Sequence, residues 1–273
     1  MPDPFIIMSA PNGARRQKLD HPILPITPAE LAECAKQIVA QGASILHLHV
    51  RDKQNQHSLD VEQYRSAISA IRASVGDQLL IQVTSEAVGK YTRFEQMQMV
   101  RDLKPEAVSL ALREICPSEK ELPEAAEFIS WMQEERVFPQ YILYDQSDIG
   151  RFTSLLARGV IETQFPFVLL VIGRKQSSQI DSNLERAKML DAALELPCPW
   201  AICGFGLHEK QCVSFATENA GHIRVGFENN ILRNDQDLLQ NNAEMIGYCA
   251  EIAKTASRPV ASIDDVRSMF HLE

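Results

Sequence analysis

The feature that most constrains this chain is an alternation of short apolar runs with longer segments of helical periodicity. Each apolar run holds four to six residues, and a segment whose apolar residues recur every three to four positions follows it. Strands that alternate with helices in this way pair in parallel through right-handed crossovers. The eight runs are Phe5–Ser9, Ile45–Val50, Leu79–Thr84, Ala107–Leu110, Gln140–Leu143, Phe167–Val171, Trp200–Cys203 and His222–Val225.

Helix start signals support the same organisation. A Ser or Thr followed three residues later by Glu or Asp is the pattern of a capping box, and it precedes several of the periodic segments. Helices are therefore expected to begin near Thr27, Thr92 and Ser182, to run from Asp235 to about Ala256, and to run from Ser262 to Phe270.

Eight strand–helix units in 273 residues predict an α/β fold, namely a (β/α)8 TIM barrel with an additional C-terminal helix. Residues 1–273 are expected to form a single TIM-barrel domain. A doubly wound open sheet is the main alternative. No GxGxxG or GxxxxGK[ST] motif follows any of the apolar runs, so the nucleotide-binding forms of that sheet lose support. In a barrel the carboxyl ends of the strands carry the catalytic groups.

Charge and composition bear on the partners and the compartment. The formal net charge is −9 and the pI is about 5.3, whereas nucleic-acid binders are usually basic, so no nucleic-acid partner is expected. No run reaches the roughly 18 apolar residues of a membrane span. The N-terminus does not resemble a signal peptide, because no positive charge precedes its short apolar run. The six cysteines form no CxxC pair, which favours reduced thiols in a cytoplasmic protein.

Two histidines lie two positions apart near the end of the second expected strand, at His47 and His49. Side chains two apart on a strand share a face, so both imidazoles point the same way. Leu46, Leu48 and Val50 make the other face apolar, as packing against a helix requires, which directs the histidines into the barrel. Two such imidazoles can share one cation. The alternative is a pair of histidines on a partly polar surface.

Glu228 follows the eighth expected strand and therefore lies on the same rim as His49. Two histidines and one carboxylate leave coordination positions open, which is the arrangement of a catalytic metal centre. Zinc is the first choice of metal, and another divalent metal such as ferrous iron accepts the same ligands. The alternative role for Glu228 is a loop carboxylate or a helix cap.

Several segments resemble the β-keto acid cleavage enzymes, a family formerly described as a domain of unknown function that includes 3-keto-5-aminohexanoate cleavage enzyme. The resemblance runs through nearly the whole chain, with the motifs in the same order, and it agrees with the barrel. The segments that carry it are residues 12–14 (NGA), 24–28 (LPITP), 40–52 (AQGASILHLHVRD), 201–208 (AICGFGLH) and 221–228 (GHIRVGFE).

The resemblance implies a homo-oligomeric zinc enzyme, a tetramer, that converts a β-keto acid and acetyl-CoA into acetoacetate and a new acyl-CoA. By similarity His47, His49 and Glu228 bind the zinc, and Arg224 is the catalytic arginine. A Lewis-acid metal polarises the keto group, and a guanidinium beside it can hold a carboxylate with two hydrogen bonds. Because arginine stays charged, clamping suits Arg224 better than proton transfer. The alternative for Arg224 is an ion-pair residue at a strand end.

Three residues at the end of the third expected strand are further site candidates. Thr84 and Ser85 resemble the family's Ser-Thr pair, one of whose hydroxyls touches the substrate. A hydroxyl pair before a helix also serves as a cap. Glu86 follows where the family usually has glycine.

Four positions that are acidic in the family are neutral or basic in this chain, and they are Arg15, Ala111, Ile142 and Asn229. A pocket without those carboxylates should not favour a cationic amino-keto acid. Arg15 and Arg113, if both reach the barrel mouth, would favour an anionic or neutral polar tail on the substrate.

The loss of the acid at Asn229 bears on proton transfer. An asparagine can orient the arginine through its carbonyl group but adds no charge, so another group is expected to move the proton. Glu86, Glu114 and His208 are the candidates.

Two other functions stay open. A zinc-dependent carbon–carbon lyase or aldolase on the same scaffold would need no acetyl-CoA, and a non-catalytic metal-dependent binding protein would keep the ligands without turnover. No phosphate-binding glycine loop identifies a CoA site, so acetyl-CoA as co-substrate is implied by the resemblance alone. An amidohydrolase-type barrel fits less well, because its HxH pair lies on the first strand.

Overall fold

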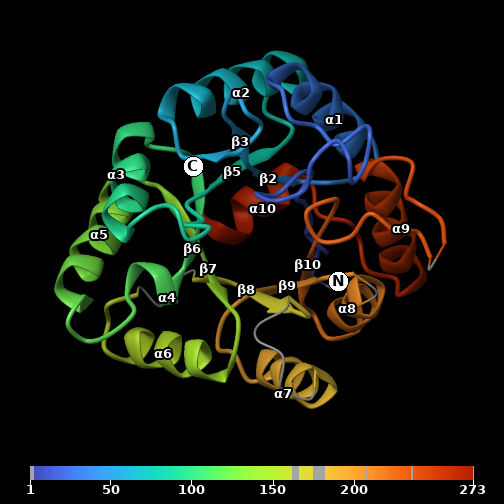
Figure 1. Ribbon diagram of the computed structural model, residues 1–273. Helices are drawn as coiled ribbons and strands as arrows, with labels where there is room; N and C mark the ends of the chain where they lie inside the picture. The colour runs from blue at the N-terminus through green and yellow to red at the C-terminus, as the bar shows by residue number, and fades with distance from the viewer. Residues whose placement is uncertain (1–2, 162–165, 175–181, 207, 235, 273) are drawn as a thin grey trace.

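The strands close into a barrel in the computed structural model, which describes residues 3–161, 166–174, 182–206, 208–234 and 236–272. Eight parallel strands are hydrogen-bonded in the order β1-β10-β9-β8-β7-β6-β5-β2, and β1 pairs with β2 to complete the ring. The (β/α)8 prediction is confirmed (Figure 1). The barrel strands are β1 (Ile7–Ser9), β2 (Ile45–Leu48), β5 (Leu80–Thr84), β6 (Ala107–Ala111), β7 (Phe138–Leu143), β8 (Phe167–Ile172), β9 (Trp200–Gly204) and β10 (His222–Val225).

The helices form an outer ring around the strands, and α10 crosses the middle of the ring behind the barrel (Figure 1). Capping boxes with both hydrogen bonds begin α1, α3 and α10, at Thr27, Thr92 and Ser262 as expected. The side chains that would cap α7 at Ser182 lie outside the described residues. The helices are α1 (Pro28–Ala40), α2 (Val61–Val75), α3 (Arg93–Leu103), α4 (Leu112–Ile115), α5 (Leu122–Glu134), α6 (Gln146–Ala157), α7 (Ser182–Leu194), α8 (His208–Glu218), α9 (Asn242–Thr255) and α10 (Ile263–Phe270).

Each strand divides its side chains between two apolar layers. On β2, Leu46 and Leu48 belong to the layer between strands and helices, whereas Ile45 belongs to the layer inside the barrel. The inner layer continues into α10, where the Phe270 ring lies 4.7 Å from the rings of Phe138 and Phe167. The additional C-terminal helix therefore closes the amino-terminal end of the barrel.

The second strand is shorter than expected. It ends at Leu48, and the next residues form a separate antiparallel pair of β3 (Val50–Arg51) with β4 (His57–Ser58). This hairpin lies at the carboxyl end of β2. Its turn is closed by the Asp52 N–H, which donates to the Gln56 carbonyl at 2.8 Å.

The long helix expected from Asp235 to Ala256 is wrong in its first part. Helix α9 begins at Asn242 with Asn241 as its cap, and Asp235 lies outside the described residues. The preceding loop forms turns instead, because the Asn230 side chain accepts from the Leu232 N–H at 2.9 Å and Asn234 accepts from the N–H of Asp237 at 2.8 Å. Local side-chain bonds of this kind compete with a helix.

Two findings concern the membrane and the thiols. Within the described part of the chain, no helix is long and apolar enough to cross a membrane. All six cysteines are unpaired, and all but the half-buried Cys198 are buried.

Candidate metal centre and active site

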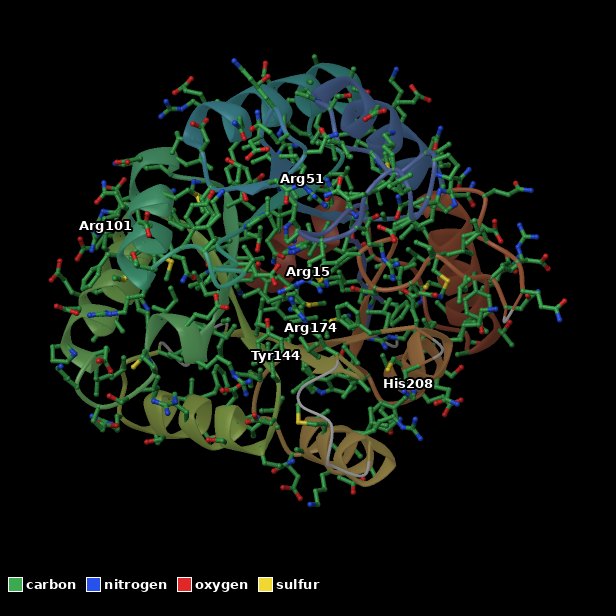
Figure 2. All side chains as sticks on the ribbon, viewed as in Figure 1. Arg15, Arg51, Arg101, Tyr144, Arg174 and His208 are labelled. Carbon is green, nitrogen blue, oxygen red and sulfur yellow. The ribbon has the colours of Figure 1, made fainter. Side chains whose placement is uncertain are left out.

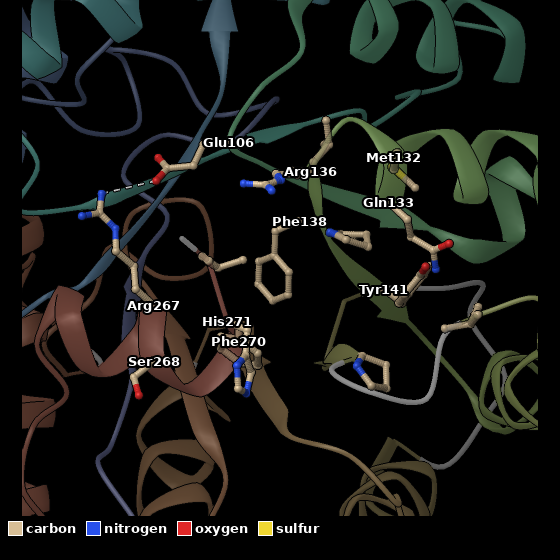
Figure 3. Close-up of a pocket in the computed structure, with 15 residues that line it drawn as sticks. Glu106, Met132, Gln133, Arg136, Phe138, Tyr141, Arg267, Ser268, Phe270 and His271 are labelled. Atoms are coloured by element: carbon tan, nitrogen blue, oxygen red, sulfur yellow. Dashed lines mark ion pairs between the residues drawn. The ribbon is translucent and has the colours of Figure 1, made fainter.

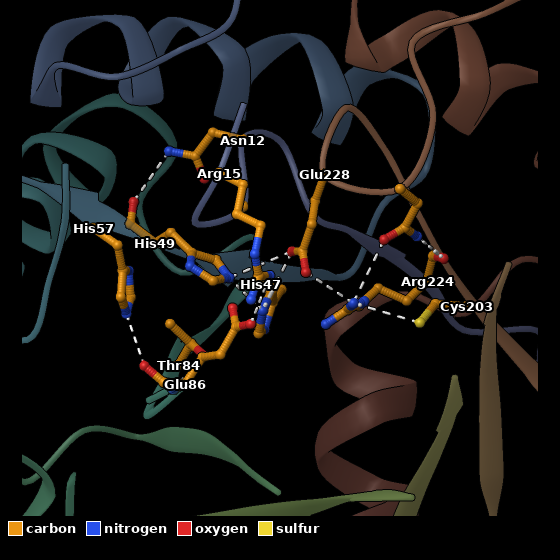
Figure 4. Close-up of polar contacts among 12 residues, drawn as sticks. Asn12, Arg15, His47, His49, His57, Thr84, Glu86, Cys203, Arg224 and Glu228 are labelled. Atoms are coloured by element: carbon orange, nitrogen blue, oxygen red, sulfur yellow. Dashed lines mark hydrogen bonds and ion pairs between the residues drawn. The ribbon is translucent and has the colours of Figure 1, made fainter. Parts of the chain in front are cut away.

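His47 and His49 lie together at the carboxyl end of β2, with their side chains inside the barrel mouth. Their Nε2 atoms are 3.0 Å apart, and both side chains are buried. The strand alternation explains this, because the leucines between and before them pack outward on the helices. The shared face predicted from the sequence is therefore present (Figure 4).

Glu228 reaches the same point from the loop after β10. Its Oε2 lies 3.6 Å from His47 Nε2 and 3.4 Å from His49 Nε2, and the candidate ligand atoms of the three residues all lie within 4.8 Å of one another. Gly13 makes room for this carboxylate. Gly13 has φ of +61°, and a Cβ there would lie 2.4 Å from Glu228 Cγ. Only glycine accommodates both that backbone and that contact.

The protonation of this cluster suits a cation. His47 Nδ1 bonds Gln82 Oε1 at 2.8 Å, so it is Nδ1 that carries the hydrogen and Nε2 that offers a lone pair. Burial lowers the pKa of His47 to about 3, so the ring is neutral at pH 7. Among the described residues, the buried Glu228 Oε2 has no hydrogen-bond donor. His47 Nε2, His49 Nε2 and Glu228 Oε2 thus converge on one point inside the barrel mouth, and the three residues fit a divalent metal.

Arg224 lies on β10 directly beside the carboxylate. Its Nη2 donates to Glu228 Oε1 at 3.1 Å and approaches Cys203 Sγ at 3.4 Å and Asn229 Oδ1 at 3.5 Å. Burial would raise the pKa of the Glu228 carboxyl, but Arg224 and His49 outweigh it and hold that pKa well below 4.5. The Asn229 amide also donates to the Arg224 carbonyl at 2.8 Å, so it orients the arginine without adding charge.

The loop that carries Glu228 is fastened by two buried side chains that sequence reasoning missed. Glu209 on α8 accepts from the Gly226 N–H and from the Asn230 amide, each at 3.1 Å. Asn242 at the start of α9 accepts from the Phe227 N–H at 2.8 Å. Burial raises the pKa of Glu209 to about 8. A buried carboxylate within a helix carries no sequence pattern that separates it from a surface glutamate.

The carboxyl end of β5 carries three candidate residues, Thr84, Ser85 and Glu86. Their polar side-chain atoms form different hydrogen bonds and ion pairs. The Thr84 hydroxyl oxygen accepts from the Glu86 N–H at 3.1 Å, which leaves its own proton available to donate. The Ser85 hydroxyl donates to the Ser109 carbonyl at 3.1 Å and is fully buried. The Glu86 carboxylate binds two arginines, Arg15 at 3.0 Å and Arg174.

Arg174 follows β8 and was not a candidate from the sequence. Figure 2 shows Arg15 and Arg174 near the middle of the ring of helices, in contrast to Arg101 at its outer edge. Arg174 also donates to the Tyr144 hydroxyl at 3.3 Å. Its contact with Glu86 joins β8 to β5 across the barrel, so only the closed ring brings the two residues together.

Arg113 was expected to favour an anionic or neutral polar substrate tail if it reached the barrel mouth, but its charge is taken up by two acids. Arg113 binds both Asp145 and Asp148, and its Nε lies 2.9 Å from Asp148 Oδ2. The two acids neutralise it beside α6. Ala111 and Ile142 do face the barrel interior, where both belong to the inner apolar layer.

The two other candidates for proton transfer, Glu114 and His208, form hydrogen bonds with groups other than the histidine pair. Glu114 accepts from the Ala87 N–H at 3.0 Å, and burial raises the pKa of its carboxyl. His208 Nδ1 lies 2.8 Å from Arg186 Nη1, and burial together with that arginine lowers the pKa of His208.

A cavity of about 1140 Å³ opens at the opposite end of the barrel, around the start of β7 and the end of α10. Figure 3 shows Phe138 and Phe270 in it, with the Glu106–Arg267 ion pair to one side. Since catalytic groups of such barrels lie at the carboxyl ends of the strands, this cavity is separate from the candidate centre.

The strands form a closed parallel barrel, and two histidines, a glutamate and a buried arginine lie at their carboxyl ends. These features define the class of protein, which is a (β/α)8 barrel with a candidate metal-dependent active site. The model of the β-keto acid cleavage enzyme family matches residues 4–272, so the chain belongs to this family. It is an enzyme of the β-keto acid cleavage type.

Two curated relatives match over nearly their full lengths. The chain is 29% identical to 3-keto-5-aminohexanoate cleavage enzyme from Fusobacterium nucleatum, with 100% of both chains covered. It is 24% identical to 3-oxoadipate:acetyl-CoA acetyltransferase from Cupriavidus necator, with 100% of this chain and 96% of the relative covered. The solved binary complex of ObcA with oxaloacetate has a TM-score of 0.74 at 16% identity, covers 92% of this chain and 67% of its own, and supports the fold.

Proposed function

We propose that this protein is a zinc-dependent β-keto acid cleavage enzyme that converts a β-keto acid and acetyl-CoA into acetoacetate and a new acyl-CoA. The dependence on a metal is supported by the convergence of His47, His49 and Glu228. Among the described residues, no hydrogen-bond donor contacts the buried Glu228 Oε2. The names of the curated relatives support the reaction.

His47, His49 and Glu228 would hold the divalent metal, which when bound supplies a Lewis acid for the oxygens of the β-keto acid. Gln82 keeps the His47 ring in the tautomer that presents Nε2. Arg224 stabilises negative charge on the substrate carboxylate, since a buried guanidinium remains charged. The Thr84 hydroxyl can donate to a substrate oxygen, whereas the Ser85 hydroxyl is committed to the Ser109 carbonyl.

Glu114 is the best suited of the three residues considered for proton transfer. Its burial raises the pKa of the carboxyl, which is the direction that suits a carboxyl group acting in proton transfer. The pKa of Glu86 is held low, although burial opposes this, by interactions with His49 and Arg174. The pKa of His208 is lowered. Turnover that collapses in Glu114→Gln with the metal still bound would support this role, and unchanged turnover would remove it.

Family similarity supports three further parts of the proposal. We infer a homo-oligomer, a tetramer, in which each chain is a single barrel domain, and a cytoplasmic location in keeping with the six unpaired cysteines. The partners are then the β-keto acid and acetyl-CoA.

One observation favours a second function. By the resemblance to the family, Asn229 stands where an aspartate follows the zinc glutamate. Arg224 therefore has an uncharged amide as its partner at that position. A carbon–carbon lyase or aldolase on the same scaffold would cleave the keto acid without acetyl-CoA.

Metal analysis together with a β-keto acid panel, run with and without acetyl-CoA, tests the proposal. We expect stoichiometric zinc that is lost in Glu228→Gln, and acetoacetate together with an acyl-CoA only when acetyl-CoA is present. Substrate loss without acetyl-CoA would support the lyase instead. Binding of a keto acid without any product would indicate a binding protein.

A further inference from the structure

The carboxyl end of the barrel holds a second polar cluster beside the candidate metal centre, made of Arg15, Glu86 and Arg174. Arg15 comes from the loop after β1, Glu86 from the end of β5 and Arg174 from the end of β8. Both guanidiniums bind the same atom, Glu86 Oε1. Figure 4 shows Arg15 and Glu86 beside the His47 and Glu228 side chains.

The charges within this cluster do not balance. One carboxylate faces two guanidiniums, so a positive charge is left over. Glu86 is largely buried, with 9% of its side chain exposed, whereas Arg15 is 62% exposed and Arg174 is 23% exposed. The neighbouring acid, Glu114, accepts from the Ala87 N–H at 3.0 Å, and burial raises the pKa of its carboxyl. An anion that reaches the mouth would supply the missing negative charge.

Hydrogen-bond donors are also left over. A guanidinium offers five N–H donors. Within the described part of the chain, Arg15 uses one on Glu86, and Arg174 uses one on Glu86 and one on the Tyr144 hydroxyl. Arginine matches a carboxylate with two parallel hydrogen bonds, and the spare donors allow that geometry.

Other arginines near the mouth are committed elsewhere. Arg51 donates to the backbone carbonyls of Gly13, Arg16 and Asn55, so it holds the loop that carries Arg15. Arg113 is neutralised by its two aspartates. Arg224 is assigned to the β-keto acid group by the proposed function, so Arg15 and Arg174 are left as the arginines that can act on the rest of a ligand.

The cluster adjoins the metal centre, so it can meet the part of a substrate that extends beyond a β-keto acid group held there. The metal ligands and Arg224 suit the β-keto acid group, and the strands that carry Glu86 and Arg174 end on the same rim as those ligands. The aromatic rings of Tyr144 and Phe205, each 5.7 Å from the Arg174 guanidinium carbon, flank this arginine and favour a short apolar spacer in the ligand.

We propose that Arg15 and Arg174 bind a second carboxylate at the far end of the substrate, so the preferred substrates are β-keto dicarboxylic acids. Glu86 acts as a positioning residue that holds the two guanidiniums side by side. This inference rests on the proposed function, because it takes the metal centre as the site of the β-keto acid group.

The test compares 3-oxo acids of matched length that end in a carboxylate, a methyl group or an amine-bearing carbon. Affinity is measured by titration calorimetry on the metal-loaded protein without acetyl-CoA. We expect the carboxylate-ended acid to bind most tightly. Arg174→Gln and Arg15→Gln should each weaken its binding about tenfold or more, since each removes a charge-assisted hydrogen bond. The methyl-ended acid should bind all variants alike.

Arg101→Gln is the matched control, because Arg101 lies on the outer face of the ring, 3.5 Å from Glu127, and its loss should leave all affinities unchanged. Arg15 is mostly exposed, so its variant keeps the test valid if Arg174→Gln does not fold. Equal affinity for methyl and carboxylate ends, or equal loss for both in Arg174→Gln, would overturn the inference. Selective carboxylate binding without turnover would instead refute the proposed reaction and leave this inference standing.

Discussion

At the scale of single residues, the candidate centre depends on close packing as much as on its ligands. Glu228 can reach the histidines because Gly13 has no side chain at the point where the two loops touch. Gln82 fixes the orientation of the His47 ring. The Gln82 amide in turn donates to Gln140 Oε1 at 3.1 Å, so a series of hydrogen bonds runs from His47 into the barrel interior. Such outer contacts set the orientation of metal ligands, and their loss typically costs about 10–100-fold in metal affinity.

Gly13→Ala should displace Glu228 and weaken metal binding by about 10–100-fold, as measured by competition with a chelator of known affinity. The added methyl would lie 2.4 Å from Glu228 Cγ, so the carboxylate must move. The positive φ alone also strains alanine. Gly159→Ala separates the two effects, because Gly159 has a similar φ of +68° and no atom within 4 Å of the added Cβ. Equal metal affinity in both variants would contradict the steric argument.

At the scale of the secondary-structure elements, the sequence predicted what is periodic and missed what depends on closure. Short apolar runs between segments of helical periodicity predicted the eight strands. The HxH pair on β2 predicted a shared face, because side chains repeat every two residues along a strand. The contact of Glu86 with Arg174 depends on two strands that are not neighbours in the ring, and no local pattern carries that information.

The wrong start of α9 has the same kind of cause. Periodicity extends upstream of Asn242, but the asparagines of the preceding loop form hydrogen bonds with nearby backbone groups and stop the helix. The β3–β4 hairpin was missed because each of its strands holds two residues, too few for an apolar alternation to appear.

Strand β10 is tied to β1 by a histidine whose charge state is set by burial. His222 Nδ1 accepts from the Ile6 N–H at 3.1 Å, and its ring packs edge-on against Phe167. Burial lowers the pKa of His222 from 6.5 to about 3. Between pH 3 and pH 6.5 this histidine binds a proton in the unfolded chain but not in the folded protein. This contribution to stability is therefore present above pH 6.5 and is lost as the pH falls toward 3.

His222→Asn should flatten the dependence of the unfolding free energy on pH between 3 and 6.5. Asparagine keeps an acceptor for the Ile6 N–H but does not titrate. The slope should fall by up to about 1.4 kcal/mol per pH unit, the value for one proton. Chemical denaturation at several pH values measures it, and the slope is compared because the smaller side chain also lowers stability at every pH. An unchanged slope would show that this histidine is already protonated or exposed.

At the scale of the whole molecule, the net charge and the local charge have opposite signs. The chain carries −9 overall, yet Arg15, Arg174 and Arg224 gather at the carboxyl end of the barrel. Surface charges are screened over about 8–10 Å at physiological ionic strength, so the distant acids oppose an anionic substrate weakly. The guanidiniums lie at the site itself, so their charge would outweigh the distant acids for a ligand bound there.

The two ends of the barrel also have different roles, because one end carries the candidate centre and the other contributes to stability. The carboxyl end holds the candidate centre, whereas α10 seals the amino end with the Phe270 ring tilted against the rings of Phe138 and Phe167. Phe270 is 3% exposed. Inner-layer residues such as Ile45, Leu169 and Ala201 lie in the same apolar cluster as Phe270, between the amino end and the rim of the barrel.

Phe270→Ala should therefore lower the free energy of unfolding by about 3–5 kcal/mol, the usual loss for a buried phenylalanine, and leave the metal affinity of the folded protein unchanged. Denaturant titration measures the first and chelator competition the second. Leu19→Ala is the control for removal of a large apolar side chain, because Leu19 is 100% exposed and its loss should change stability by less than about 0.5 kcal/mol. A fall in metal affinity in Phe270→Ala would mean that the barrel transmits packing changes along its axis, and the division between its two ends would not hold.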